Sequence, residues 1–428
     1  MSKLNISTRV IAVCDNLLMV TNDQKATLAD GFAELAFIVD KNTGEQITDE
    51  LSIDFLLRAE EEIEWKPVDE YYFDVYQNEN TYNYSLEQSS LLGFALGDAF
   101  GVPYEFLPKE KIRTLELDGM IGKDTNMQFK SRWSDLIPSG AWSDDTSMIY
   151  STMDAIVTCD GRIDNNKIMQ SFVDWWEKGK YCALNLPFGL GATVGQALSC
   201  YVAGKEPLEC GCKSIRSNGN GSLMRILPFS LYCIRRDLTE SETVIVTSNA
   251  SALTHGHDIS KMGCFIFTEF MRGLFETRNP EMAFKKLLFI DYHKYFSDEA
   301  VEAYSRLLNK DFKNTKDEEM NGSGYVVDTL ECAIYSILNT NDFEDAIKMA
   351  VNTGYDTDTI AGVTGALAGT LYGVNKLPEK WINKLRKKDE LDLIALKYSI
   401  ILDRLKKNDL ENMFVDIEDD DLDFLYKK

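Results

Sequence analysis

The sequence has little of what a zinc site or a disulfide framework requires. Its 428 residues include only three histidines and nine scattered cysteines, an odd number. The two closest cysteines, Cys210 and Cys212, are two positions apart, which is not the usual spacing of zinc ligands. The composition therefore disfavours a zinc site, and free thiols in a reducing compartment are the simpler interpretation.

Long apolar runs are also missing. No stretch approaches the roughly 20 apolar residues that a membrane-spanning helix requires. The first residues, from Met1 to Asp15, show neither the apolar region nor the small-residue cleavage site of a secretory signal. We therefore expect a cytoplasmic protein that has no membrane partner.

Positive charge is scarce relative to negative charge. The chain has 45 Lys and Arg residues against 69 Asp and Glu residues, for a net charge of −24. Such a surface repels phosphate backbones, so nucleic acid is disfavoured as a partner. It suits divalent cations or a basic protein partner, although ordinary solvated surface accounts for most of these charges.

The chain divides by composition into three parts. Residues 1–84 carry 17 acidic and 6 basic residues. Their β-prone runs, Arg9–Val20 and Ala33–Asp40, and a helical pattern over Thr48–Ile63 predict a small α+β extension. Residues 409–428 form an acidic tail, which we expect to be a frayed helix or a mobile end.

Between these parts, residues 85–408 show helical periodicity with no competing strand alternation, which predicts one all-α domain. The expected helices are Leu86–Phe100, Thr146–Thr158, Ile168–Lys178, Leu190–Val202, Glu242–Ser251, Ile259–Phe275, Tyr325–Leu338, Phe343–Val351 and Thr359–Tyr372.

Two acidic motifs stand at expected helix starts. Trp142–Thr146 reads WSDDT, and Gly354–Thr359 reads GYDTDT. Ser and Asp are ordinary helix caps, and capping is the favoured interpretation of the first motif taken alone. Adjacent carboxylates nevertheless repel each other unless a cation lies between them. Together the motifs offer four carboxylates and several hydroxyls, which are the hard oxygen ligands that suit Mg²⁺ or Mn²⁺.

Three further segments are rich in small or polar residues. The backbone amides of Phe188–Thr193 and Ser217–Arg225 are suited to approach a phosphate or a sugar, although each segment alone indicates only a turn. Thr254–His257 contains two histidines, but no third soft ligand stands near them. A single histidine that binds a substrate or a core partner is therefore favoured over a metal site there.

Two more acids differ in their settings. Asp98 lies within an apolar helix, where an ionised carboxylate is costly unless it is paired. We therefore favour a structural role for Asp98, either capping another helix or pairing with a cation. Glu105 follows Pro103 beyond the expected helix end, and it is free to point into a cleft.

In this order, the motifs resemble the ADP-ribosylglycohydrolase family, which includes the dinitrogenase reductase-activating glycohydrolase and the arginine- and serine-directed ADP-ribosyl hydrolases. The resemblance runs from about Leu86 to Trp381. It rests on the segments GDAFGVPYEF, SDDT, GLGAT, GNGSLMR, LTHGH, GSGYVVDTLE and GYDTDTIAGVTGALAG. It implies an all-α fold, a site for two Mg²⁺ or Mn²⁺ ions, and hydrolysis of ADP-ribose from a modified acceptor.

The resemblance also implies roles for individual residues. Those matching the family's metal ligands are Ser143, Asp144, Asp145, Asp356, Asp358 and Thr359. Those matching positions that contact ADP-ribose are Gly189, Gly191, Ser217, Asn218, Asn220 and His255. The residues expected to act in catalysis are Glu105, Asp144 and Asp145, and the proton acceptor is either Glu105 or a metal-bound aspartate.

Two positions depart from the family pattern. Asn218 stands where some members have an aromatic residue, which puts base stacking there in doubt. Tyr355 replaces the second glycine of the family's Gly-Gly-Asp, and its ring is expected either to narrow the cleft or to alter the choice of substrate.

Three hypotheses for function follow. The form GNGSLMR resembles the bacterial arginine-directed branch, so we expect removal of ADP-ribose from modified protein arginine. The extension 1–84 raises the alternative of an immunity or regulatory protein that binds and neutralises an ADP-ribosyltransferase toxin, with or without hydrolase activity. A dimerisation or stabilising role for the extension is equally compatible with the sequence. A catalytically inert family member is disfavoured because the set of carboxylates is complete.

Overall fold

The structure is a computed structural model in which the chain forms two compact units, 1–83 and 84–428. It describes residues 85–405 and, before them, 9–14, 17–21, 35–40, 47, 51–53, 56 and 66–72. The acidic tail 409–428 lies outside these described residues. No described helix has both the length and the apolar character to cross a membrane.

The described part of the first unit is a five-stranded antiparallel sheet in the order β4-β3-β2-β1-β5. The strands are β1 (Arg9–Cys14), β2 (Leu17–Thr21), β3 (Leu35–Asp40), β4 (Leu51–Ser52) and β5 (Lys66–Tyr72). A small core holds them together, formed by Ile11, Ala12, Met19, Ala36, Ile38, Ile53 and Leu56. The two β-prone runs of the sequence therefore form β1, β2 and β3, as predicted.

Two features of this unit differ from the sequence-based expectation. The helix expected over Thr48–Ile63 is wrong at its start, because Leu51 and Ser52 form the edge strand β4, which pairs with β3. Strand β5 was not expected, since its acidic and aromatic residues show no clear alternation. It forms because its backbone pairs with that of β1, and such pairing between distant segments produces no hydrophobic alternation in the sequence.

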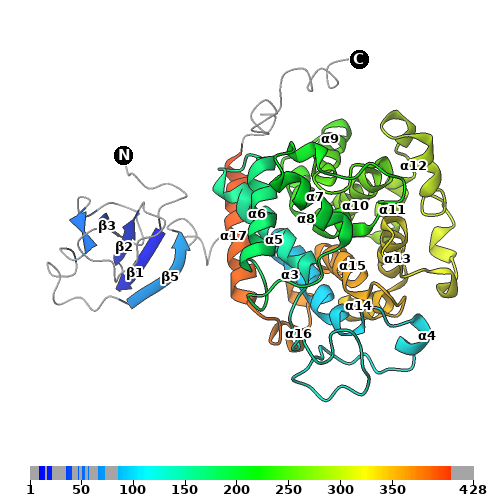
Figure 1. Ribbon diagram of the computed structural model, residues 1–428, viewed down its shortest axis with the longest axis horizontal. Helices are drawn as coiled ribbons and strands as arrows, with labels where there is room; N and C mark the ends of the chain where they lie inside the picture. Colours follow the sequence, from blue (N-terminus) through cyan, green and yellow to red (C-terminus); the bar gives the residue numbers. More distant parts are fainter. Residues whose placement is uncertain are drawn as a thin grey trace. The chain divides into compact units, whose positions relative to one another are not determined.

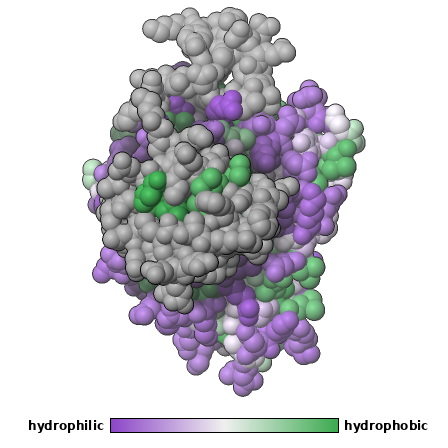
Figure 2. Space-filling view, turned by 90° about the vertical axis from the view of Figure 1, so that its left-hand side faces the viewer, coloured by the Kyte–Doolittle hydropathy of each residue, from purple (hydrophilic) through white to green (hydrophobic). Residues whose placement is uncertain are grey.

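The second unit is helical, and its described residues contain no β-strand. Its helices are α3 (Ser85–Gly101), α4 (Lys109–Ile112), α5 (Asp144–Thr158), α6 (Asn165–Lys178), α7 (Ala192–Val202), α8 (Leu227–Arg235), α9 (Glu240–Ala252), α10 (Asp258–Thr277), α11 (Pro280–Leu287), α12 (Asp298–Ala303), α13 (Val326–Asn339), α14 (Phe343–Val351), α15 (Thr357–Tyr372), α16 (Glu379–Ile382) and α17 (Lys388–Arg404). Each expected helix is present. Figure 2 shows hydrophilic residues over much of the described surface on one side, with hydrophobic residues in smaller groups.

An antiparallel pair, α3 and α15, lies at the centre of the helical unit (Figure 1). Every residue of α15 except Tyr372 is buried, as expected of a helix that is apolar and small on all sides. The two backbones touch because Gly93 faces Gly365 and Gly97 faces Ala361, so an added methyl group at either glycine would overlap a carbonyl oxygen. This contact brings the end of α3 beside the start of α15.

Helix α5 joins this pair through one buried carboxylate. Asp98 of α3 accepts hydrogen bonds from the backbone amides of Ser143, at 3.0 Å, and Thr146, at 3.1 Å, and from the Thr146 hydroxyl, at 2.6 Å. The predicted structural role of Asp98 as the cap of another helix is therefore confirmed. The start of α5 is thus fixed next to the central pair, and the two acidic helix starts lie together.

Candidate active site

The starts of α5 and α15 open into one cavity of about 660 Å³ in the helical unit. Most of the residues singled out in the sequence line it, namely Glu105, Asp144, Asp145, Gly189, Gly191, Asn220, His255, Asp356, Asp358 and Thr359. The fold therefore gathers residues that are up to about 250 positions apart in the chain into one place.

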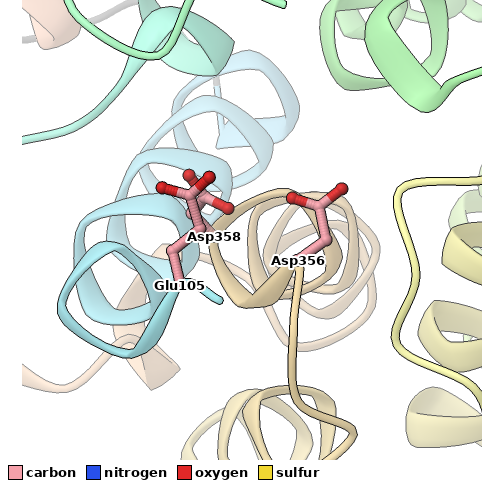
Figure 3. A group of neighbouring side chains, drawn as sticks. All are labelled: Glu105, Asp356 and Asp358. Carbon is pink, nitrogen blue, oxygen red and sulfur yellow. The ribbon is translucent and has the colours of Figure 1, made fainter. Parts of the chain in front are cut away.

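Three carboxylates form the tightest group in the cavity (Figure 3). Glu105 follows the short 3-10 turn at the end of α3, whereas Asp356 precedes α15 and Asp358 lies in its first turn. One carboxylate oxygen from each residue lies within 4.8 Å of the others. Oxygen atoms at this spacing can bind one cation, so Glu105, expected in catalysis, is also in reach of a metal ion.

The acids of this cavity are held in an electrostatically unfavourable arrangement. Burial raises the pKa of Asp144, Asp145 and Asp358 well above the usual range, and repulsion among the neighbouring carboxylates raises it further. Burial likewise raises the pKa of Asp356, against the hydrogen bond from Asn220. Among the described residues, Asp145 Oδ2 is buried with no hydrogen-bond partner. A bound cation would stabilise the charges and complete this oxygen's coordination, so the residues fit a divalent metal ion.

Glu105 is positioned by an aromatic residue that the sequence did not reveal. The indole Nε1–H of Trp133 donates a hydrogen bond to Glu105 Oε2. Burial raises the pKa of Glu105 to about 7, although this hydrogen bond and the Arg132 charge act in the opposite direction. A carboxylate with a pKa near neutrality is suited to exchange a proton with water at physiological pH.

The glycine-rich segments line the cavity beside the acids. Gly189 has a φ of +95°, and an added Cβ would overlap Asp144 Oδ1, so only glycine fits beside this acid. Gly191 caps α7, and an added Cβ there would meet no atom within 4 Å. Asn220 donates a hydrogen bond of 2.6 Å to Asp356 Oδ2 and one of 2.9 Å to the Thr329 hydroxyl. Asn220 therefore orients an acid of the cluster as well as lining the cavity.

Three of the residues that the resemblance assigned to the site do not line the cavity. Ser143 is the buried N-cap of α5, and its hydroxyl accepts from the Asp145 amide at 3.2 Å. Asn218 is buried, where its side chain accepts from the Ser260 hydroxyl at 2.8 Å and donates to the Ile215 carbonyl at 3.0 Å. Ser217 is half-buried in the same loop. In the structure these contacts hold backbone segments that carry cavity residues.

The mouth of the cavity contains two exposed aromatic side chains, Phe106 and Tyr355. Both have left-handed backbones, with φ of 66° and 57°. They are joined by a hydrogen bond of 2.6 Å from the Phe106 amide to the Tyr355 carbonyl. The guanidinium of Arg132 lies 5.1 Å from the centre of the Phe106 ring. Tyr355 was noted in the sequence as a departure, whereas Phe106 was not.

A further segment also lines the cavity, through Asn321, Ser323 and Gly324. Ser323 and Gly324 belong to the motif GSGYVVDTLE, which was part of the resemblance but was given no role in the site. An added Cβ at Gly324 would lie 3.0 Å from Asp356 Oδ2. The residues themselves give only a weak signal of this role, because glycines before a helix such as α13 are common in loops.

The helical unit thus combines a cavity lined by glycines with buried carboxylates at two helix starts, a set of residues that fits a divalent cation. The chain belongs to the ADP-ribosylglycohydrolase family, whose model matches residues 87–409. By this membership it is an ADP-ribosyl-acceptor glycohydrolase. The resemblance inferred from the sequence motifs and the all-α fold with its small α+β extension are thereby confirmed.

Several relatives match about 70% of the chain. The chain is 29% identical to an ADP-ribosylarginine hydrolase, Tri1, of Serratia proteamaculans over 72% of this chain and 77% of that one. It is 26% identical to the ADP-ribosyl-[dinitrogen reductase] glycohydrolase of Rhodospirillum rubrum over 71% and 91%. A solved structure titled "ADP-ribosylglycohydrolase-related protein complex" has a TM-score of 0.59 and 24% identity and covers 74% of this chain and 98% of its own, which supports the fold.

Proposed function

We propose that the chain hydrolyses the bond between ADP-ribose and the guanidinium of a modified protein arginine, with the aid of two Mg²⁺ or Mn²⁺ ions. The observation that carries this proposal is the joining of a buried acidic cluster and glycine-rich walls in one cavity. The acidic cluster can bind cations, and the glycine-rich walls leave backbone amides accessible to a phosphate or a sugar.

The proposed metal ligands that line the cavity are Asp144, Asp145, Asp356, Asp358 and Thr359 at the two helix starts, together with Glu105 beside them. Ser143 is proposed with them through its place as the cap of α5, next to Asp144. When bound, the ions would supply Lewis acidity toward ribose hydroxyls and water. The residues themselves fix the geometry. Asn220 holds Asp356, and the Thr359 amide donates to Asp358 Oδ1 at 2.9 Å. These contacts limit the freedom of the carboxylates before any ligand binds.

We propose Glu105 as the base that accepts a proton from the attacking water. We propose Asp144 and Asp145 as the carboxylates that hold the ribose in place at the reacting carbon. The water oxygen bonds to the anomeric carbon, its proton passes to Glu105, and the carbon–nitrogen bond breaks to release the guanidine. The transition state resembles an oxocarbenium ion, which the negative charges of the cavity stabilise. Trp133 leaves one oxygen of Glu105 available for this proton.

The residues at the mouth of the cavity favour arginine as the modified acceptor. A guanidinium cation favours a site that is acidic and bordered by aromatic rings. Arg132 already places a guanidinium over the Phe106 ring and 4.7 Å from the centre of the Trp133 ring. The names of the Tri1 relatives from Serratia proteamaculans and Pseudomonas putida, both ADP-ribosylarginine hydrolases, point to the same acceptor.

The direct test is release of ADP-ribose from proteins modified on arginine, compared with serine-linked and nucleic-acid-linked substrates. We expect activity with Mn²⁺ or Mg²⁺ on the arginine substrate and none after chelation. Asp358→Asn should reduce kcat/KM by at least about 100-fold. The same variant should be more stable than the parent without metal, because one repelling charge is removed, so misfolding would not explain the loss. Full activity of Asp358→Asn would refute the metal mechanism.

A second role is suggested by the separate N-terminal unit. Residues 1–83 form their own compact unit and lie outside the family match. We propose as the alternative function an immunity or regulatory protein whose extension binds and neutralises a partner ADP-ribosyltransferase toxin. Binding of a transferase to the full chain, and its loss on deletion of 1–83, would support this role. Equal binding by both forms would show that the extension is not the binding element.

A further inference from the structure

His255 lies at the wall of the cavity on a chain of hydrogen bonds that leads into the protein core. The ring is 1% exposed and lines the cavity. Its Nδ1 lies 2.9 Å from the hydroxyl oxygen of Thr254, which in turn lies 2.7 Å from Nη2 of Arg225. All three side chains are buried, so these contacts are shielded from water.

The direction of this chain follows from which atoms carry protons. A guanidinium only donates, so the Thr254 hydroxyl oxygen accepts from Arg225. The hydroxyl has one proton of its own, and the acceptor that the structure offers it within the described residues is Nδ1 of His255. If Nδ1 were the donor instead, the buried Thr254 proton would have no acceptor, which is unfavourable. Nδ1 therefore accepts, and in a neutral ring the proton is on Nε2.

Arg225 also keeps the ring uncharged. Its side chain is fully buried, where it donates to the Ala250 carbonyl at 2.9 Å and lies 5.1 Å from the centre of the Phe172 ring. Its Nη2 bonds to Ala250 and Thr254, and its Nε and Nη1 have no hydrogen-bond partner among the described residues, so no described carboxylate neutralises it through a hydrogen bond. Burial, together with this neighbouring positive charge, lowers the pKa of His255 to about 3. The thiol of Cys264 also lies near Arg225, and burial raises its pKa to about 11, so it adds no negative charge.

The Nε2 edge of His255 faces the glycine loop. A Cβ added at Gly221 would lie 2.9 Å from Cε1 and 3.5 Å from Nε2, and one added at Gly219 would lie 3.7 Å from Nε2. Both glycines line the cavity. The structure records no protein partner for Nε2 among the described residues, so this N–H is open to a ligand.

We propose that Arg225 and Thr254 are positioning residues that fix His255 as a neutral imidazole whose Nε2–H donates to an acceptor oxygen of the ADP-ribosyl group. The part that names the ligand rests on the proposed function. The tautomer does not, because it is a property of the protein without ligand.

The test is nitrogen NMR of the full chain labelled at its three histidines, His255, His257 and His293. His255→Gln assigns the signal. We expect a His255 ring that is protonated at Nε2 alone and does not titrate between pH 5.5 and 8. Thr254→Val, which keeps the shape but removes the hydroxyl, should broaden or mix the two tautomers, and Thr254→Ser should restore the single one. A ring protonated at Nδ1, or one that titrates in this range, would overturn the inference.

Binding of ADP-ribose measured by calorimetry provides the second readout. Thr254→Val should weaken it about five- to tenfold, and Thr254→Ser should recover most of the loss. The matched control is Thr247→Val, which removes another buried hydroxyl whose bonds, within the described residues, go to backbone carbonyls of α9. Equal loss in both valine variants would overturn the positioning role. If the parent chain binds no ADP-ribose, the ligand assignment and the proposed function are refuted together, and the NMR result still decides the tautomer.

Discussion

Gly97 of α3 and Ala361 of α15 are in direct backbone contact, so that a methyl group on Gly97 would overlap the Ala361 carbonyl oxygen. Between Gly97 and Glu105 lie the last turn of α3 and the 3-10 turn Val102–Tyr104, and Ala361 is one turn of α15 away from Asp358. The distance between these two carboxylates therefore depends on the close approach of two helices, and on glycine where they touch.

Replacing this glycine should disturb both stability and the site. We expect Gly97→Ala to lower the free energy of unfolding by about 3 kcal/mol or more, because backbone atoms rather than a flexible side chain must move. Urea unfolding measures this change. The control is Gly195→Ala in α7, where the new methyl group would make only ordinary contacts with Leu190. It should raise stability by up to about 1 kcal/mol, as alanine does inside a helix. Similar values for both variants would contradict the close contact.

The cap formed by Asp98 makes a second prediction. Three donors converge on its two oxygens, so in Asp98→Asn the amide N–H₂ would face an N–H or O–H group. We expect a loss of about 3 kcal/mol in urea unfolding with Mn²⁺ present, so that relief of carboxylate repulsion does not offset it. The control is Asp164→Asn at the surface cap of α6. The asparagine oxygen can still accept from the Lys167 amide, so this variant should lose only a few tenths of a kcal/mol of stability.

The pH dependence of stability without metal follows from Glu105. Its pKa is about 7 in the folded chain against 4.5 when unfolded, so the folded state binds one more proton between these values. Stability should therefore fall as pH rises from about 4.5 to 7, by roughly 3 kcal/mol from this group. The other buried acids, with raised pKa values, act in the same direction. Thermal unfolding of the metal-free chain at several pH values measures how stability changes with pH.

Two comparisons make this test specific. Glu105→Gln should reduce the dependence of stability on pH, because the neutral amide does not titrate. Added Mn²⁺ should stabilise the parent chain most at high pH, where the carboxylates are ionised. Stability that rises with pH in the metal-free parent would show that burial does not control these acids.

Tyr355 should affect the acceptor more than the chemistry. Its φ of 57° disfavours a bulky side chain, so Tyr355→Gly should raise stability by about 1 kcal/mol. If its ring contacts the acceptor guanidinium, KM for ADP-ribosylated arginine should rise about tenfold with kcat little changed. The control, Asp160→Gly, relieves a similar φ of 53° away from the cavity and should leave KM unchanged. An unchanged KM in Tyr355→Gly would remove the ring from acceptor binding.

The helices could be predicted from the sequence because their signals are local. Apolar periodicity and capping residues such as Ser143 mark α5, and the small residues after Asp356 mark α15. Even so, the helix expected over Glu242–Ser251 begins earlier, at Glu240, because Thr239 and Glu242 form a capping box. The edge strands β4 and β5 escaped prediction because they are defined by pairing with distant segments.

The candidate site divides in the same way. The paired acids could be identified because each pair is a short motif that is unusual at a helix start. The hydrogen bond from Trp133 to Glu105, and that from Asn220 to Asp356, join residues 28 and 136 positions apart. No local sequence pattern predicts such contacts. They form when α15 packs against α3, which positions Glu105 beside Asp358, and against the segment that contains Asn220.

The contact between Gly97 and Ala361 also means that two parts of the cavity differ in how freely their residues can be replaced. Glu105, Asp356 and Asp358 adjoin a helix pair whose touching glycines leave no room for a larger side chain, so we expect few tolerated substitutions there. Phe106 and Tyr355 stand on exposed turns, where substitutions leave that pair untouched. A lineage could therefore exchange one modified acceptor for another through a few changes at the mouth while inheriting the bond-breaking apparatus intact.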